Sequence, residues 1–200
     1  MLKEMKRIDI VENFDDNNWH EIQKVIYESH ADNRRNGVDI RNAHLTPQEL
    51  QNSIGQNGKC FIALDGEKIV GTCSVAFQQK KCWYVQGEVA YNTLEGVLSE
   101  YKGQHIYKRL SQKRLEYIQS RGCNVIYMNV AEKNYARRII AQKEGFKKVA
   151  IHYNSYNPHN YITYCYWIGK QPFSDFEISI KYGISLLKLW LKYFKRRIFK

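Results

Sequence analysis

The residues that could do chemistry gather in the stretch from Gly96 to Leu110. The sequence predicts that an apolar strand ends near Leu98, that Gly103 lets the backbone turn sharply, and that a helix begins at about His105. The first turn of a helix carries unpaired backbone N–H groups, and the helix dipole favours negative charge there. With the cation of Lys102 beside it, this turn could hold a pyrophosphate. An ordinary strand–turn–helix connection without a ligand explains the same residues equally well.

A second strand–helix pair follows. The run from 125 to 130 is apolar and predicts a short buried strand. Asn134 can cap the helix after it, and Gly145 can end that helix. Taken alone, this is also consistent with a capped helix that has no functional role.

Together and in this order, the two features resemble the GNAT superfamily of acyl-CoA N-acyltransferases over residues 61–153. In that family a strand ending in Val-x-Pro-x-Tyr-Arg-Gly-x-Gly-x-Gly leads into the pyrophosphate-binding helix. The motif Asn-x-x-Ala-x-x-Leu-Tyr-x-x-x-Gly-Phe closes the set. The residues that match are Val97, Tyr101, the basic Lys102, Gly103, Asn134, Ile140, Gly145 and Phe146.

The sequence also departs from the family pattern. Ser99 stands at the Pro position, and His105 and Tyr107 stand at the last two Gly positions of the first motif. In the second motif Arg137 replaces Ala, and Ala141 replaces the Tyr that normally protonates the leaving CoA thiolate. Bulky side chains at glycine positions change how a phosphate can approach the backbone.

The resemblance implies acetyl-CoA as a co-substrate. The six histidines show no metal-ligand spacing, so no metal site is expected. The resemblance also implies a sheet that opens between the fourth and fifth strands, with backbone groups of the fourth strand holding the pantetheine. Carried over position by position, the cofactor-binding residues are Val97, Leu98, Lys102, Gly103, Gln104, His105, Ile106, Tyr107 and Asn134.

The implied reaction is direct attack of a primary amine on the thioester, so a base must remove a proton from the amine. Glu95 is the first candidate, because it lies two residues before Val97 and so shares its face of the strand. Glu88, upstream on the same strand, is the second. His105 is a third possible base. Tyr135 or Tyr107 could replace the missing acid at Ala141, and Tyr135 is the one counted among the catalytic candidates. For each carboxylate, a solvated or salt-bridged side chain is the alternative.

The acceptor is expected to be a small-molecule amine. Arg34, Arg35 and Arg41 would suit an acceptor that carries phosphate or carboxylate, such as an amino-sugar nucleotide. A solvated basic loop is the alternative. The rival to an enzyme is a GNAT-fold module that has lost catalysis and serves as a binding or membrane-tethered scaffold.

The charge of the chain is unevenly distributed. The formal net charge is +11, and seven cations but no acid follow Glu177. This argues against a nucleic-acid-binding body and for a basic tail with its own role. The five cysteines lack C-x-x-C spacing, which indicates buried reduced thiols in a cytosolic protein. The N-terminus lacks the apolar run of a signal peptide, so a cytoplasmic location is expected.

We expect two parts in the chain, a GNAT-like acyltransferase domain of residues 1–170 and a basic amphipathic tail of residues 171–200. Its apolar residues recur at steps of three and four from Phe176 to Ile198, with lysines opposite, which predicts an amphipathic helix over 174–200. Two interpretations stay open. The helix packs on the domain or on a twin subunit in a homodimer, or it lies on an anionic membrane, at the inner surface.

The predicted fold is α/β (α+β), a mixed central β-sheet flanked by helices on both faces, GNAT-like, with the added C-terminal helix. An early hairpin at Asp65-Gly66 predicts antiparallel pairing at the start. Strands that alternate with helices after Leu94 predict parallel pairing later. Gly87 and Gly96 are the expected bulges, and residues 32–39 are expected to form a loop. Strands are predicted at 5–11, 60–65, 69–77, 83–98, 125–130, 146–153 and 161–168.

Overall fold

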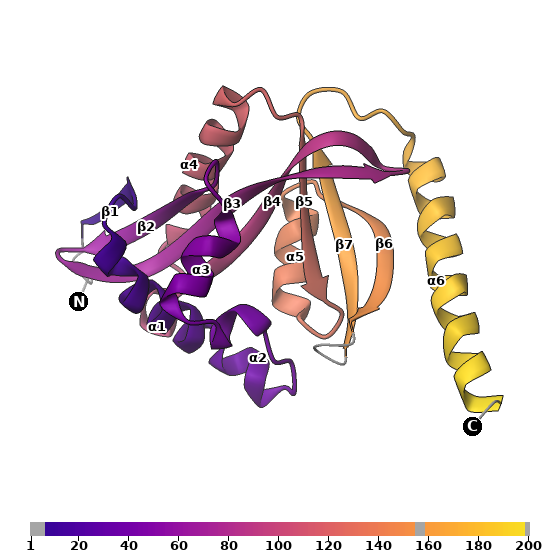
Figure 1. Ribbon diagram of the computed structural model, residues 1–200, viewed down its shortest axis with the longest axis horizontal. Helices are drawn as coiled ribbons and strands as arrows, with labels where there is room; N and C mark the ends of the chain where they lie inside the picture. Colours follow the sequence, from indigo (N-terminus) through magenta and orange to yellow (C-terminus); the bar gives the residue numbers. More distant parts are fainter. Residues whose placement is uncertain (1–6, 155–158, 199–200) are drawn as a thin grey trace. The chain divides into compact units, whose positions relative to one another are not determined.

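A computed structural model describes residues 7–154 and 159–198 of the chain. It contains a mixed seven-stranded sheet with strand order β1-β2-β3-β4-β5-β7-β6, flanked by helices, which confirms the predicted fold class (Figure 1). The chain divides into two compact units. The first comprises Met1–Gln78 and Ala90–Cys123, and the second comprises Gln79–Val89 and Asn124–Lys200. The predicted boundary between residues 170 and 171 stays a prediction.

The first unit is built on β1 (Ile8–Glu12), β2 (Lys59–Asp65) and parts of β3 (Lys68–Cys82) and β4 (Val85–Val97). β1 pairs antiparallel with β2, and β2 pairs antiparallel with β3 through the predicted hairpin. β3 runs past its predicted end at residue 77, through the polar residues that follow. The side chains of residues 78–81 are exposed or half-buried. This part of β3 therefore lacks a buried apolar face, which explains why the sequence pattern did not predict it as strand.

The helices of this unit are α1 (Trp19–Ser29), α2 (Ala31–Arg35), α3 (Pro47–Ile54) and α4 (Ile106–Ser120). In Figure 1, α1 and α3 lie on one side of the strands and α4 lies on the other. The short 3₁₀ helices are η1 (Asp16–Asn18), η2 (Arg41–His44) and η3 (Ser99–Tyr101).

Two local predictions for these helices had different outcomes. α3 begins with the predicted capping box, in which Thr46 and Glu49 satisfy each other's backbone N–H groups. The loop predicted for residues 32–39 is partly wrong, because α2 occupies its first half. An ion pair of 2.9 Å between Asp32 and Arg35, one helical turn apart, supports this short helix.

The second unit contains β5 (Val125–Ala131), α5 (Tyr135–Lys143), β6 (Lys147–Asn154), β7 (His159–Trp167) and α6 (Asp175–Ile198). β7 lies between β5 and β6 and pairs antiparallel with both. The expectation of parallel neighbours is therefore wrong for these strands. The helix between β5 and β6 does carry the chain back across the sheet, but it leaves one strand position empty, and β7 then fills it.

All five cysteines are free thiols, and every one except Cys82 is buried, as predicted. Part of the expected first strand, residues 5 and 6, and the last two residues of the expected final helix lie outside the described residues. In the part of the chain that the structure describes, no helix has both the length and the apolar character needed to cross a membrane.

Candidate functional site

The end of β4 and the turn after it are fixed to the β2–β3 hairpin. The backbone N–H of Leu98 donates to the carbonyl of Val70 at 2.9 Å. Tyr101 is buried, and its hydroxyl donates to Asp65 Oδ2 at 2.6 Å. The one aromatic residue of the turn that matches the family motif is therefore a structural anchor.

The N-terminus of α4 is open. Gly103 has a φ of 83° and the N-terminal cap residue, His105, a φ of 59°, so the chain reaches the helix through two left-handed residues. Within the described residues, no side chain caps this helix and its first turn contains no acid. The first backbone N–H groups of a helix and the positive end of its dipole favour an anion. Lys102, Gly103, Gln104 and His105 are exposed at this end of α4.

The two bulky residues at glycine positions behave differently. His105 holds a left-handed conformation that costs a non-glycine residue about 1 kcal/mol. Tyr107 directs its hydroxyl back toward β4, where it donates to Glu95 Oε1 at 3.2 Å. Its side chain is half-buried and does not project into the turn. Lys102 is exposed but forms a 3.1 Å ion pair with Asp32, and this bond lowers the pKa of Asp32.

Glu95 forms a buried ion pair with α4. Its Oε1 lies 2.7 Å from Arg114 Nη1, and the two side chains are 16% and 2% exposed, respectively. Burial works to lower the pKa of Arg114, but the charge of Glu95 raises it further, so the net shift is upward. The guanidinium is charged at every accessible pH and lies against the carboxylate of Glu95. Of the two alternatives for this residue, the structure therefore contains the salt-bridged one.

The backbone around Glu95 is unusual. Leu94 is buried and has a φ of 51°, a conformation that non-glycine residues avoid. Of the two glycines where bulges are expected, Gly87 has a positive φ of 117°, and the bulge at Gly96 stays a prediction. Gly96 serves another purpose: a Cβ there would overlap Ser29 Oγ and approach Ser29 Cβ to 3.0 Å. Its bareness lets the end of α1 rest on β4.

His30 lies directly after α1, beside Glu95. Its imidazole hydrogen-bonds to the backbone of Glu95, and its Nδ1 lies 3.0 Å from Asn33 Nδ2. Burial lowers the pKa of His30 below its ordinary 6.5, against the opposing effect of Glu95. The ring is therefore neutral near pH 7. No spacing rule could find this neighbour, because 65 positions of sequence separate it from the strand.

The remaining predicted site residues belong to the second unit. Asn134 is buried and caps α5, because its side chain accepts from the N–H of Arg137 at 3.1 Å. Tyr135 is 67% exposed, with the guanidinium of Arg138 5.4 Å from its ring centroid. Glu88 is exposed on the part of β4 that belongs to this unit.

The arginines expected near the acceptor already have partners within the first unit. The guanidinium of Arg34 lies 3.8 Å from the ring centroid of Tyr27, and Arg35 pairs with Asp32. A phosphate bound there would compete with these contacts. The structure thus supports the plainer interpretation of this loop.

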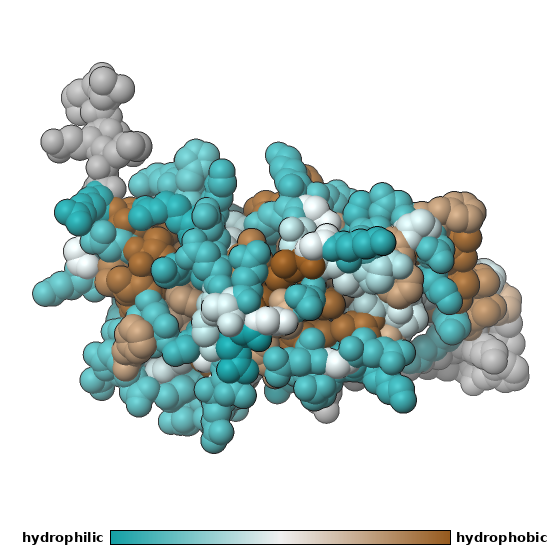
Figure 2. Space-filling view, turned by 90° about the horizontal axis from the view of Figure 1, so that it is seen from above, coloured by the Kyte–Doolittle hydropathy of each residue, from teal (hydrophilic) through white to brown (hydrophobic). Residues whose placement is uncertain are grey.

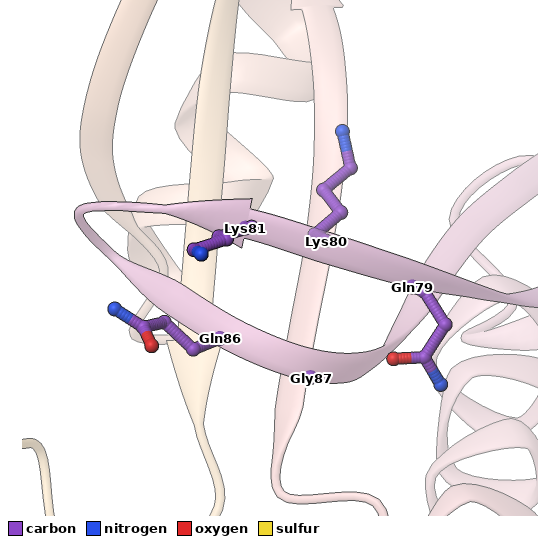
Figure 3. A pocket seen from close by; sticks show the side chains of 5 residues that line it. All are labelled: Gln79, Lys80, Lys81, Gln86 and Gly87. Carbon is purple, nitrogen blue, oxygen red and sulfur yellow. The ribbon is translucent and has the colours of Figure 1, made fainter.

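A shallow hollow of about 410 Å³ lies on the distal part of the β3–β4 hairpin, lined by Gln79, Lys80, Lys81, Gln86 and Gly87 (Figure 3). Lys80 and Lys81 point away from each other, as neighbours on a strand do. Lys80 lies 4.3 Å from the ring centroid of Tyr127. No predicted site residue lines the hollow, so it is separate from the candidate site.

Comparison with known proteins bears on these features directly. Residues 19–146 match the model of the Acetyltransferase (GNAT) family. No curated protein matches the sequence.

Several solved structures share the fold. An acetyltransferase from Streptococcus agalactiae has a TM-score of 0.63 at 16% identity, covering 80% of this chain and 98% of that one. The ribosomal-protein-S18-alanine N-acetyltransferase from Escherichia coli has a TM-score of 0.60 at 13% identity, covering 84% and 99%. The NatC complex bound to Gag peptide and CoA has a TM-score of 0.63 at 15% identity, covering 82% and 99%. At these identities the likeness is one of fold.

Proposed function

Because the chain belongs to the acetyltransferase (GNAT) family, we propose that it is a cytoplasmic N-acetyltransferase that transfers an acetyl group from acetyl-CoA to the primary amine of a small molecule. The family match supports acyl transfer in general. Acetyl-CoA as the donor agrees with the family and with the structural neighbour that binds CoA.

The observation that carries the proposal is the open N-terminus of α4. In our proposal its backbone N–H groups hold the pyrophosphate of CoA, with contacts from Lys102 through Tyr107. Val97 and Leu98, at the end of β4, contact the pantetheine. The family resemblance adds Asn134 to the proposed cofactor-binding residues. Gly103 and His105 have left-handed backbone conformations, and both residues lie directly before the first turn of α4.

We assign the base to Glu95, which acts through a water molecule. It takes a proton from the acceptor ammonium, and the neutral nitrogen then bonds to the thioester carbon. The carbon–sulfur bond breaks, and the nitrogen loses a second proton, which balances the proton that the leaving thiolate takes. The leaving CoA thiolate takes a proton, for which Tyr135 is the proposed donor. Arg114 and Tyr107 hold the Glu95 carboxylate in place. Glu88 is the second candidate base.

An acceptor of the amino-sugar nucleotide class is a narrower form of the proposal. It would require Arg34 and Arg35 to exchange their present partners for phosphate oxygens, so a smaller, less charged amine fits the observed contacts better.

A GNAT-fold module without catalysis is the second candidate. It is favoured by the side chains of His105 and Tyr107 at glycine positions and by Ala141 where the family has its acid. Both candidates predict a folded protein, but they differ in turnover.

The test is release of free CoA thiol from acetyl-CoA by the full chain, with a panel of small amines and mass spectrometry of the products. We expect turnover with at least one amine. Glu95→Gln should lower kcat by on the order of 100-fold or more, with a small change in KM for acetyl-CoA. Binding of acetyl-CoA without thiol release for any amine would favour the non-catalytic module.

A further inference from the structure

α6 docks on the second unit through a single narrow face. Ile178 is buried, and Tyr182, Ser185 and Leu189 are half-buried along the same line. Ser185 Oγ accepts from the N–H of Ile151 at 2.9 Å and donates to the carbonyl of Ile151 at 3.0 Å. Ile151 lies in β6, the last strand of the sheet, and α6 runs beside it (Figure 1). The helix thus covers an open strand edge.

The opposite face of α6 is apolar and exposed. At 100° per residue, its residues lie about half a turn from the docked line. They include Phe176, 74% exposed, and Trp190, 58% exposed. Figure 2 shows hydrophobic side chains along the edge of the molecule where α6 lies. The exposed apolar residues of this face are Phe176, Ile180, Ile184, Leu187, Trp190, Leu191 and Phe194. Tyr193 belongs to the docked side, where its hydroxyl donates to Asn160 Oδ1 at 3.0 Å.

This arrangement differs from the usual one, in which the apolar stripe of a helix packs on its own domain. In α6 the face that packs on the second unit is the less apolar one. The expectation that the apolar face of the helix packs on its own domain is therefore wrong. The exposed apolar side chains recur along the helix from Phe176 to Phe194, and monomeric proteins rarely leave a strip of this kind in water.

Cations border the strip on one side. Lys181, Lys188 and Lys192 are exposed and fall between the apolar strip and the docked line. The sequence contains no acid after Glu177. The surface therefore combines hydrocarbon, aromatic rings and positive charge, with no negative charge along most of its length.

We propose that this outer face of α6 binds the surface of a membrane rich in anionic phospholipids, with the helix axis in the plane of the membrane. The apolar strip enters the boundary between headgroups and acyl chains, and the lysines meet lipid phosphates. Trp190 suits this boundary, because its ring is apolar and its N–H group is polar.

A second copy of the chain fits the same face less well. Two copies of α6 packed antiparallel about a two-fold axis would bring both lysine rows to the same side, where they repel. No carboxylate follows Glu177 to pair with them. The lipid phosphates of an anionic membrane supply the missing negative charge.

Membrane binding is independent of the proposed acetyl transfer, so the two can fail separately. The test is co-sedimentation of the full chain with vesicles of phosphatidylcholine alone and with vesicles that contain about one third phosphatidylglycerol. We expect binding to the anionic vesicles that weakens with salt, together with a blue shift of tryptophan fluorescence. The shift should be lost in Trp190→Phe, because Trp190 is the tryptophan on the strip.

Two variants dissect the surface. Lys181→Gln/Lys188→Gln/Lys192→Gln should weaken partition to anionic vesicles by on the order of 100-fold. The matched control, Lys24→Gln/Lys113→Gln/Lys143→Gln, removes three exposed cations elsewhere and should weaken it far less. Leu187→Ser/Leu191→Ser should abolish binding while the fold is kept, because both side chains are exposed.

Two results would overturn the proposal. One is that the full chain does not co-sediment with either kind of vesicle. The other is a dimer in sedimentation velocity that dissociates in Leu187→Ser/Leu191→Ser, since the strip would then belong to a second copy.

Discussion

Two regions of this protein break the same rule in opposite directions. In the first unit, Glu95 and Arg114 place opposite charges in the interior, where charged groups are rare. In the second unit, α6 places a strip of hydrocarbon outside, where large apolar surfaces are rare. The buried charges have each other as partners, whereas the exposed strip has no partner within the described residues of the chain.

The difference teaches where to look for stability and where to look for recognition. A buried ion pair is costly to break, so its residues carry the fold as well as any chemistry. An exposed strip contributes little to the fold, so its residues can be changed to test binding alone.

The largest effect is expected at Glu95. Glu95→Gln leaves the guanidinium of Arg114 buried without its counter-charge and should cost about 3 kcal/mol in the free energy of unfolding. Urea denaturation measures it. Leu187→Ser/Leu191→Ser should change this free energy by less than about 0.5 kcal/mol, because both side chains are exposed. A cost for the α6 variant as large as that for Glu95→Gln would break the contrast.

A pair of glycine variants gives the next effect. Gly96→Ala should cost about 1–3 kcal/mol, because its methyl group overlaps the side chain of Ser29. Gly183→Ala, in α6, meets no atom within 4 Å and should gain about 0.5–1 kcal/mol from helix propensity. Thermal denaturation checks both signs. The added Ser29→Gly should restore much of the loss at Gly96, and failure of this rescue would show that another contact limits the site.

A smaller effect is expected at His105. His105→Gly relieves the left-handed backbone, while His105→Ala keeps it, so the glycine variant should be the more stable by about 1 kcal/mol. If the backbone N–H groups of α4 hold the cofactor, His105→Gly should also bind acetyl-CoA at least as tightly as the native chain. Calorimetry and thermal denaturation measure the two. Equal stability of the two variants would mean that the left-handed conformation is not maintained in solution.

The smallest effect concerns pH. Burial lowers the pKa of His30 in the first unit and of His152 in the second, in the latter case with the help of Lys80. Each unfolded imidazole binds its proton at a higher pH than the folded one does, so stability should fall as the pH drops below about 6.5.

His30→Gln and His152→Gln should each reduce this slope, and the double variant should reduce it further. Urea denaturation at several pH values between about 4.5 and 7 isolates the histidines from most carboxylates. A native slope that both variants leave intact would contradict the assignment.

Much of the fold follows from local signals in the sequence. The capping box at Thr46 and Glu49 and the hairpin at Asp65-Gly66 appear in the structure as the sequence predicts, because short-range hydrogen bonds and turn chemistry determine them. The position of β7 between β5 and β6 could not be predicted this way, since strand order depends on contacts between distant segments.

The candidate site was predictable in part. The spacing around Gly103 indicated the open helix terminus, and alternation along the strand indicated Glu95. The partners of Glu95 could not be found: Arg114 lies on the next helix, and His30 on a distant one. For α6, periodicity identified two faces but not which of them docks, because Ser185 decides this through the backbone of Ile151.

The most direct test of the central claim is isothermal titration of the full chain with acetyl-CoA, beside CoA alone. The account predicts saturable binding of both with a dissociation constant in the micromolar range, about −8 kcal/mol. It also predicts that Lys102→Glu weakens the binding of both ligands, because the substitution replaces a positive charge with a negative one at the N-terminus of α4. Absence of binding for either ligand would contradict a pyrophosphate site at α4 and, with it, the proposed acetyl transfer.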